Sequence, residues 1–139
     1  MILLDASGVF AALNDRERHH ADSLAVLHGF EPPLLLSPFV LAELDYLIRA
    51  TAGVDAELAL LEDVARGSYQ LEEFSAADVR EAADVITGHR DLGVGLADAS
   101  IVVLSRRHGV TDLLTLDERH FRVLRGARDR PFRLLPADA

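Results

Sequence analysis

The sequence has no cysteine and no lysine, although 14 of its 139 residues are basic. Without cysteine there is no disulfide scaffold, no thiolate metal ligand and no cysteine nucleophile. Without lysine, a phosphate-binding loop of the Walker type is incomplete. No apolar run approaches the length of a membrane span, and the apolar start is too short for a signal peptide. We therefore expect a soluble, cytoplasmic protein with no membrane partner.

The charge distribution leaves two interpretations of the basic residues open. A net charge of −9 argues against a nucleic-acid ligand, because affinity for phosphate normally comes from a basic surface. All 14 basic residues are arginines, and the C-terminal segment is rich in them. This segment is either a local basic patch or a solvated edge that reflects genome composition. Its arginines are Arg119, Arg122, Arg125, Arg128, Arg130 and Arg133.

Short apolar segments alternate with helical patterns along the chain. Strands are predicted at residues 2–4, 34–36, 69–72, 113–115 and 132–135. Helices are predicted at residues 7–14, 21–29, 39–51, 55–67, 75–87 and 96–108, with a short helix or turn from Asp117. This alternation predicts βα units, a parallel sheet and the α/β class. At this length we expect a single domain over residues 1–139.

Acidic residues interrupt or follow the apolar segments at separate places in the chain. Asp5 follows the first predicted strand, and Asp117 follows the fourth. Glu43 lies on or beside the apolar stripe of one helix, and Asp98 lies in the first turn of the most apolar helix. Ligands of parallel α/β sheets bind at the carboxyl ends of the strands. We therefore expect these acids to meet in one cleft.

Each acid also has a structural interpretation. Asp5 could cap the following helix, although Ser7 is a better cap. Asp98 is favourable near a helix N-terminus, and Asp117 could cap a short turn. Glu43 could extend its carboxylate into solvent from the edge of the stripe. The four together are more informative than any one of them.

A cluster of carboxylates favours a divalent cation. Carboxylates at close range repel one another and destabilise the fold unless a positive charge compensates. Oxygen ligands without cysteine favour Mg²⁺ or Mn²⁺ over zinc. Such a site accepts a phosphodiester and supports hydrolysis by activated water.

The other chemical residues carry weaker signals. No two histidines have the spacing of a zinc-binding helix, and we interpret all of them as surface or helix-end residues. Ser7 lacks the glycine context of a serine nucleophile. The histidines are His19, His20, His28, His89, His108 and His120.

The acidic motifs resemble those of the PIN-domain family, and within it the toxin ribonucleases of VapBC toxin–antitoxin pairs. The similarity extends over essentially the whole chain, and its motifs are at residues 4–7, 37–44, 96–99 and 114–121. The resemblance implies a three-layer α/β/α fold with a five-stranded parallel sheet, a Mg²⁺ or Mn²⁺ site and endoribonuclease activity. It also implies a homodimer, and inhibition by a cognate antitoxin whose C-terminal segment covers the active-site groove.

By position, Asp5, Glu43, Asp98 and Asp117 match the four acids of that family. The resemblance implies that Asp5 and Asp98 are the principal metal ligands. Glu43 would be a ligand or would orient the attacking water, and Asp117 would bind a second ion or act through water. The fourth acid varies in the family. Two hydroxyl residues would support the acids. Ser7 would support the first acid, Asp5, and Thr115 would hold Asp117 in place.

Other functions compete with this hypothesis. A domain of the same fold could bind a partner without cutting RNA, or it could be a nuclease of RNA processing. A phospho-acceptor domain also places an aspartate after a first strand. Its receiver type needs a lysine, and its dehalogenase type needs an aspartate where this chain has Ser7. The RNA target and the physiological ion stay open.

Overall fold

The computed structural model describes all 139 residues as strands alternating with helices. The strands are β1 (Ile2–Leu4), β2 (Leu34–Leu36), β3 (Gln70–Leu71), β4 (Asp112–Leu114) and β5 (Arg133–Leu135). The helices are α1 (Ala6–Leu13), α2 (His20–Gly29), α3 (Pro38–Ala52), α4 (Val54–Ala65), α5 (Ala76–Thr87), α6 (Leu96–His108) and α7 (Glu118–Phe121). Two 3₁₀ turns, Arg90–Leu92 and Ala127–Asp129, complete the chain.

All neighbouring strands of the sheet are parallel, in the order β3-β2-β1-β4-β5. Leu4 of β1 pairs with Leu114 of β4. The chain adds β2 and then β3 on one side of β1, and afterwards returns to add β4 and β5 on the other side. The prediction of a five-stranded parallel sheet is confirmed.

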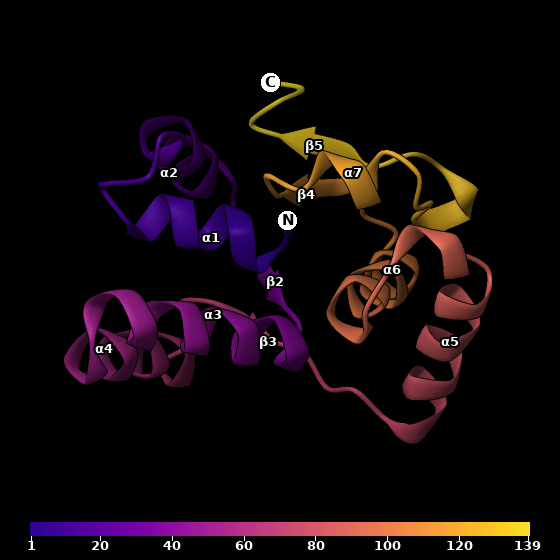
Figure 1. Cartoon of the computed structure of the whole chain (residues 1–139), viewed down its shortest axis with the longest axis horizontal. Coiled ribbons are helices and arrows are strands. Elements are labelled where there is room, and N and C mark those ends of the chain that lie inside the picture. The colour runs from indigo at the N-terminus through magenta and orange to yellow at the C-terminus, as the bar shows by residue number, and fades with distance from the viewer.

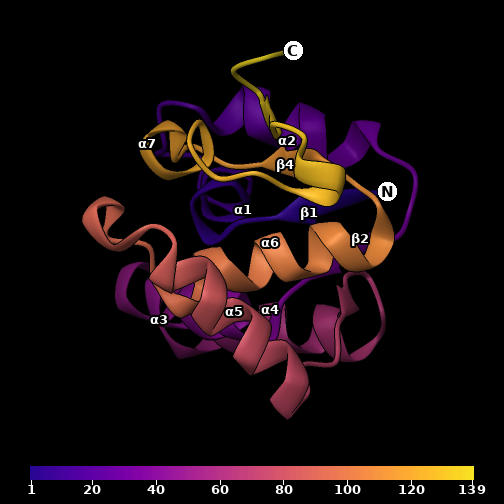
Figure 2. The same ribbon diagram turned by 90° about the vertical axis from the view of Figure 1, so that its right-hand side faces the viewer.

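Helices cover both faces of the sheet. In Figure 1 helices α1 to α4 lie to the left of the strands, and α5 and α6 lie to the right. Figure 2 turns the right-hand side of Figure 1 toward the viewer and shows α6 across the middle of the molecule, where it contacts β1 and packs against α5. Because connections between parallel strands are right-handed, reversing the direction of strand addition moves the helices to the other face. The reversal occurs between β1 and β4, so the loops after these strands diverge there.

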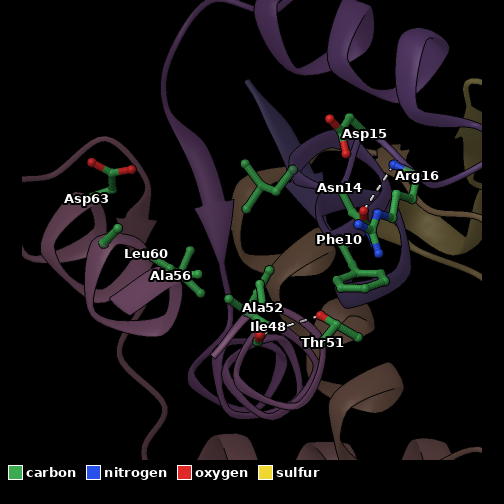
Figure 3. A pocket seen from close by; sticks show the side chains of 12 residues that line it. Phe10, Asn14, Asp15, Arg16, Ile48, Thr51, Ala52, Ala56, Leu60 and Asp63 are labelled. Carbon is green, nitrogen blue, oxygen red and sulfur yellow. Dashed lines mark hydrogen bonds between the residues drawn. The ribbon is translucent and has the colours of Figure 1, made fainter. Parts of the chain in front are cut away.

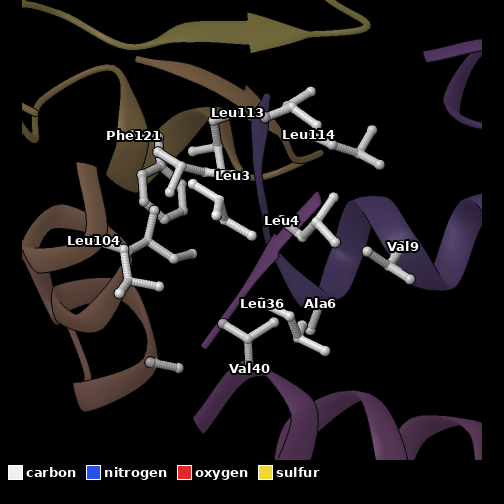
Figure 4. Close-up of a cluster of buried hydrophobic side chains, with 14 of the residues drawn as sticks. Leu3, Leu4, Ala6, Val9, Leu36, Val40, Leu104, Leu113, Leu114 and Phe121 are labelled. Carbon is white, nitrogen blue, oxygen red and sulfur yellow. The ribbon is translucent and has the colours of Figure 1, made fainter. Parts of the chain in front are cut away.

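Leucine and isoleucine fill the strands because both faces of the sheet are covered. All three residues of β1 are buried, as are the last two of β2, β4 and β5. Figure 4 shows Leu3 and Leu4 of β1 in the centre of the main apolar cluster, between side chains of β4 and those of the helices. This cluster fixes the strands on which the acidic residues depend.

The predicted elements differ from the observed ones mainly at their ends. Residues 69–72 were expected to form a strand, but β3 comprises only Gln70 and Leu71. Tyr69 is buried in the core, and the Glu72 N–H still donates to the Leu36 carbonyl at 2.9 Å. The edge strand therefore pairs over a shorter length than its apolar pattern suggests. None of the helices has the length and apolar character needed to cross a membrane.

Gly8 allows α1 to pack directly on the end of β4. A Cβ atom at this position would lie 2.6 Å from the Leu114 carbonyl oxygen and 2.7 Å from the Leu114 carbonyl carbon. Backbone atoms paired in a sheet move little, so a larger residue would push α1 away from β4. The same displacement would separate Asp5 and Ser7 from the segment after β4.

We predict that Gly8→Ala lowers the free energy of unfolding by about 1–3 kcal/mol or more, because it overpacks a rigid contact. Gly29→Ala is the matched control, since no atom lies within 4 Å of a Cβ there. Its stability should stay unchanged or rise by up to about 1 kcal/mol. Urea unfolding measures both, and equal stability of the two variants would contradict the close contact.

Candidate active site

The carboxyl ends of β1 and β4 bring the first and last acidic motifs together. Asp5 follows β1, and its N–H donates to the Leu114 carbonyl at 3.0 Å. Thr115 follows β4 at the same level of the sheet. The chain then turns to α1 on one face and to α7 on the other, which opens a crevice between them.

Two hydroxyl groups hold the carboxylate of Asp5, a buried residue that is 5% exposed. Ser7 Oγ donates to Asp5 Oδ2 at 2.8 Å, and Thr115 Oγ1 donates to the same oxygen at 2.7 Å. Each hydroxyl also accepts a backbone N–H, from Leu116 at 3.0 Å and from Asp117 at 2.9 Å respectively. Because both hydroxyls bind Oδ2, neither occupies the other carboxylate oxygen. Thr115 thus links Asp5 to the backbone of Asp117.

Helices α3 and α6 bring Glu43 and Asp98 to the same crevice. A buried contact joins the starts of these helices: Ser37 Oγ lies 2.6 Å from Ser100 Oγ, and both residues are fully buried. Ser100 Oγ donates to the Ala97 carbonyl, so Ser37 Oγ donates to Ser100. Ser37 also caps α3 by accepting the Phe39 N–H at 3.1 Å. The register of one helix against the other is therefore fixed close to both acids.

The electrostatics show that the acids interact. Burial raises the pKa of Asp5, and hydrogen bonds from Thr115 and Ser7 oppose this rise only in part. Burial also raises the pKa of Glu43 and Asp98, and the charge of Asp5 adds to the rise in both. Asp98 acts on Glu43 as well, and Asp117 acts on Asp98. The four predicted acids therefore form one repulsive cluster.

The structural interpretations of the acids hold only in part. Asp5 precedes α1 but makes no side-chain capping hydrogen bond to it. Asp98 Oδ2 accepts a long hydrogen bond of 3.4 Å from the Gly95 N–H, near the start of α6. Asp117 Oδ1 caps α7 by accepting the His120 N–H at 3.1 Å. Glu43 is exposed beside the buried stripe of α3.

His120, which we interpreted as a surface or helix-end residue, lies in the last turn of α7 but joins the acidic cluster instead of facing solvent. Its Nδ1 lies 2.9 Å from Asp117 Oδ2 and 3.1 Å from Asp98 Oδ2, and the side chain is 19% exposed. Neither contact has hydrogen-bond geometry, so this buried nitrogen has no hydrogen-bond partner. Phe121 is buried next to it and packs edge to face on Phe132, with ring centroids 5.7 Å apart. This aromatic contact anchors α7 and directs His120 inward.

The residues present fit a divalent cation. One donor atom each from Asp98, Asp117 and His120 lie within 4.8 Å of one another. Asp5 and Glu43 lie near this group, because the charge of Asp5 raises the pKa of Asp98 and the charge of Asp98 raises the pKa of Glu43. Repelling carboxylates and a nitrogen without a hydrogen-bond partner are groups that a cation would satisfy together. The metal-binding roles of the four acids, and the supporting roles of Ser7 and Thr115, stay predictions.

The largest cavity lies away from these acids. It has a volume of about 720 Å³ and lies between the C-terminal parts of α1 and α3 and helix α4. Figure 3 shows Phe10, Ile48 and Leu60 among its lining residues. A smaller open hollow of about 490 Å³ is bordered by Glu43 and Tyr46. The size of a cavity therefore does not mark the candidate active site, because neither of these hollows is lined by Asp5, Asp98 or Asp117.

A sequence model of the PIN domain matches residues 2–126. The chain belongs to the PIN-domain family. It is 38% identical to Ribonuclease VapC26 of Mycobacterium tuberculosis over 135 residues, which is 97% of this chain and 100% of that protein. The resemblance to VapC-type PIN domains is therefore confirmed.

Solved structures share the PIN fold at lower identity. VapC20 of Mycobacterium tuberculosis, a sarcin–ricin loop cleaving toxin, has a TM-score of 0.78 and 20% identity over 84% of this chain and 90% of that chain. VapBC2 of Rickettsia felis, bound to a DNA fragment from its promoter, has a TM-score of 0.66 and 19% identity over 96% of this chain and 98% of that chain. These likenesses confirm the three-layer α/β/α fold.

We predict that Asp98→Asn makes the metal-free PIN domain as stable as, or more stable than, the unchanged protein. The pKa of Asp98 is higher in the folded chain, because burial and Asp5 disfavour its ionised form. Ionisation of Asp98 therefore destabilises the fold, and this cost grows as the pH rises from the pKa of Asp98 in the unfolded chain to its higher pKa in the folded chain. The amide removes this cost at neutral pH. Thermal unfolding with a chelator measures the difference.

Added Mn²⁺ should reverse the order of stability, so that the unchanged protein becomes more stable than Asp98→Asn. A ligand that binds only the folded state raises its stability, by about 2.7 kcal/mol at 100 times the dissociation constant. The unchanged protein should gain this stability, and Asp98→Asn should gain much less. Asp15→Asn is the control, since Asp15 is exposed and has no ion pair. Equal metal stabilisation of all three proteins would contradict a cation at Asp98.

Proposed function

We propose that this protein is a metal-dependent endoribonuclease and the toxin of a toxin–antitoxin pair. The observation that supports the proposal most is the convergence of Asp5, Glu43, Asp98 and Asp117, where burial and neighbouring acids raise the pKa values of Asp5, Glu43 and Asp98. The 38% identity to Ribonuclease VapC26 supports the same activity. An RNA substrate would place the protein in the cytoplasm.

Asp5, Asp98 and Asp117 would hold Mg²⁺ or Mn²⁺, and Glu43 would complete the site or orient the attacking water. When bound, the cation would supply charge stabilisation for the phosphate and would lower the pKa of a bound water. The hydroxyls of Ser7 and Thr115 donate to Asp5 Oδ2, which holds the carboxylate in place and opposes the rise in its pKa that burial causes. No covalent intermediate with the protein is required.

Exposed arginines of the C-terminal segment would hold the RNA backbone. Arg119 lies in α7, directly before His120 and two residues after Asp117. Arg119, Arg125 and Arg128 are exposed and have no carboxylate partner, whereas Arg122 and Arg133 are in ion pairs. Only some arginines of the C-terminal segment are therefore available to form a basic patch. Phosphate contacts of this kind position a nucleic acid without reading its sequence.

The proposal predicts that purified protein cuts defined RNAs with Mg²⁺ or Mn²⁺ and that a chelator stops cleavage. The substrates should include transfer RNAs, messenger RNAs and a sarcin–ricin loop fragment. Asp5→Asn should reduce the cleavage rate by more than about 100-fold, since losing even a group that only supports a metal ligand costs about 10–100-fold. Product ends would identify the target.

Asp15→Asn should cleave at the unchanged rate, and thermal unfolding should confirm that all variants are folded. Full activity of folded Asp5→Asn, or metal-independent cleavage, would contradict the proposal. If the protein binds Mn²⁺ but cuts only precursor RNAs, it is a nuclease of RNA processing with the same fold. If it neither binds metal nor cuts, it is a binding module.

The partner would be a cognate antitoxin, and we propose that an apolar segment of it fills the largest cavity. Phe10, Ile48 and Leu60 line this cavity, which is roomy enough for several apolar side chains. Helices α1 and α3 form its walls and pack against each other. Asp5 precedes α1 and Glu43 lies in α3, so a segment that continues along these helices would reach the crevice. A homodimer stays a prediction.

Ala52→Arg tests the antitoxin site, because Ala52 is exposed and lines the cavity. Ala50→Arg is the matched control, as it is exposed on the same helix but outside the lining. After co-expression with a candidate antitoxin, Ala52→Arg should lose co-purification with it while keeping nuclease activity. Ala50→Arg should retain both. Equal binding by the two variants would place the antitoxin elsewhere.

A further inference from the structure

The geometry points to His120 as a nitrogen ligand of the cation held by Asp98 and Asp117, and we infer that it makes the site prefer Mn²⁺ to Mg²⁺. This inference rests on the proposed metal site and adds a residue to it that the acidic motifs do not include. It also addresses the choice of ion, which the acids alone leave open. His120 would then contact the metal directly instead of only supporting α7.

The positions of the donor atoms carry the inference. His120 Nδ1 lies 2.9 Å from Asp117 Oδ2 and 3.1 Å from Asp98 Oδ2. Adjacent ligands of an octahedral ion with bonds of about 2.1 Å are about 3.0 Å apart, so these separations suit a shared cation. A nitrogen that bonded to one carboxylate would have hydrogen-bond geometry toward it, and Nδ1 has none.

The packing holds His120 in this position without the cation. The His120 backbone N–H donates to Asp117 Oδ1 at 3.1 Å. Asp117 therefore holds the His120 backbone through Oδ1 and faces the His120 ring with Oδ2. The following residue, Phe121, is buried against Phe132. These contacts fix the part of the α7 backbone from which the His120 ring faces the two carboxylates.

A nitrogen ligand changes the preference of the site for the metal. Mg²⁺ prefers oxygen ligands and keeps several waters, whereas imidazole suits transition metals. A site made only of carboxylates would bind Mg²⁺ and Mn²⁺ with a smaller difference. With His120 in the ligand set, Mn²⁺ affinity rises while Mg²⁺ affinity changes little.

Calorimetry with each ion alone tests the preference on the full chain. His120→Asn places an oxygen or an amide nitrogen near the position of Nδ1, and should lower Mn²⁺ affinity by at least about ten-fold, as losses around metal ligands do. Mg²⁺ affinity should change much less, so the ratio of the two affinities should fall. His28→Gln is the control, since His28 is exposed on α2.

Electron-spin resonance of bound Mn²⁺ tests the contact directly and needs no activity. Protein labelled with ¹⁵N-histidine should show a nitrogen coupling that is present in the unchanged protein and in His28→Gln, and absent in His120→Asn. No coupling in the unchanged protein, or its persistence in His120→Asn, would overturn the inference while the acidic metal site stands. If the unchanged protein binds neither ion, both this inference and the proposed metal site fail.

Discussion

The hydrogen bonds that Thr115 and Ser7 donate to Asp5 are the contacts on which the rest of the site depends. They tie the end of β1 to the end of β4, at the point where the chain reverses the direction in which it adds strands. The same hydroxyls bind the backbone of Leu116 and Asp117, so one buried network positions two acids. The close approach of Gly8 to Leu114 supports this network from the helix side.

The network accommodates a charge that the fold alone disfavours. Asp5 is nearly fully buried, and Asp98 and Glu43 lie close enough for its charge to raise their pKa values. A chain selected only for stability would replace such acids, because repelling buried carboxylates are destabilising. Their retention in one crevice is understandable if a cation compensates them. The leucine-rich strands around them supply the stability that the cluster removes.

The sequence predicts the sheet and the acids better than it predicts their neighbours. Asp5 and Asp117 could be placed because each follows a short apolar strand, and parallel strands end at one edge. His120 could not be placed, because α7 has only four residues and shows no helical periodicity. Its direction depends on the packing of Phe121 on Phe132, which is a tertiary contact. The sequence signal that was available for His120 was its position three residues after Asp117, which is about one helical turn.

The central claim is that one cation site unites the carboxylates at the ends of β1 and β4 with those of α3 and α6. A crystal structure with Mn²⁺, located by its anomalous scattering, tests it most directly. The account predicts a Mn²⁺ peak in the crevice, in contact with carboxylate oxygens of Asp5 or Asp98 and of Asp117. A crevice without a peak at saturating Mn²⁺, or a peak bound only elsewhere on the surface, would contradict it.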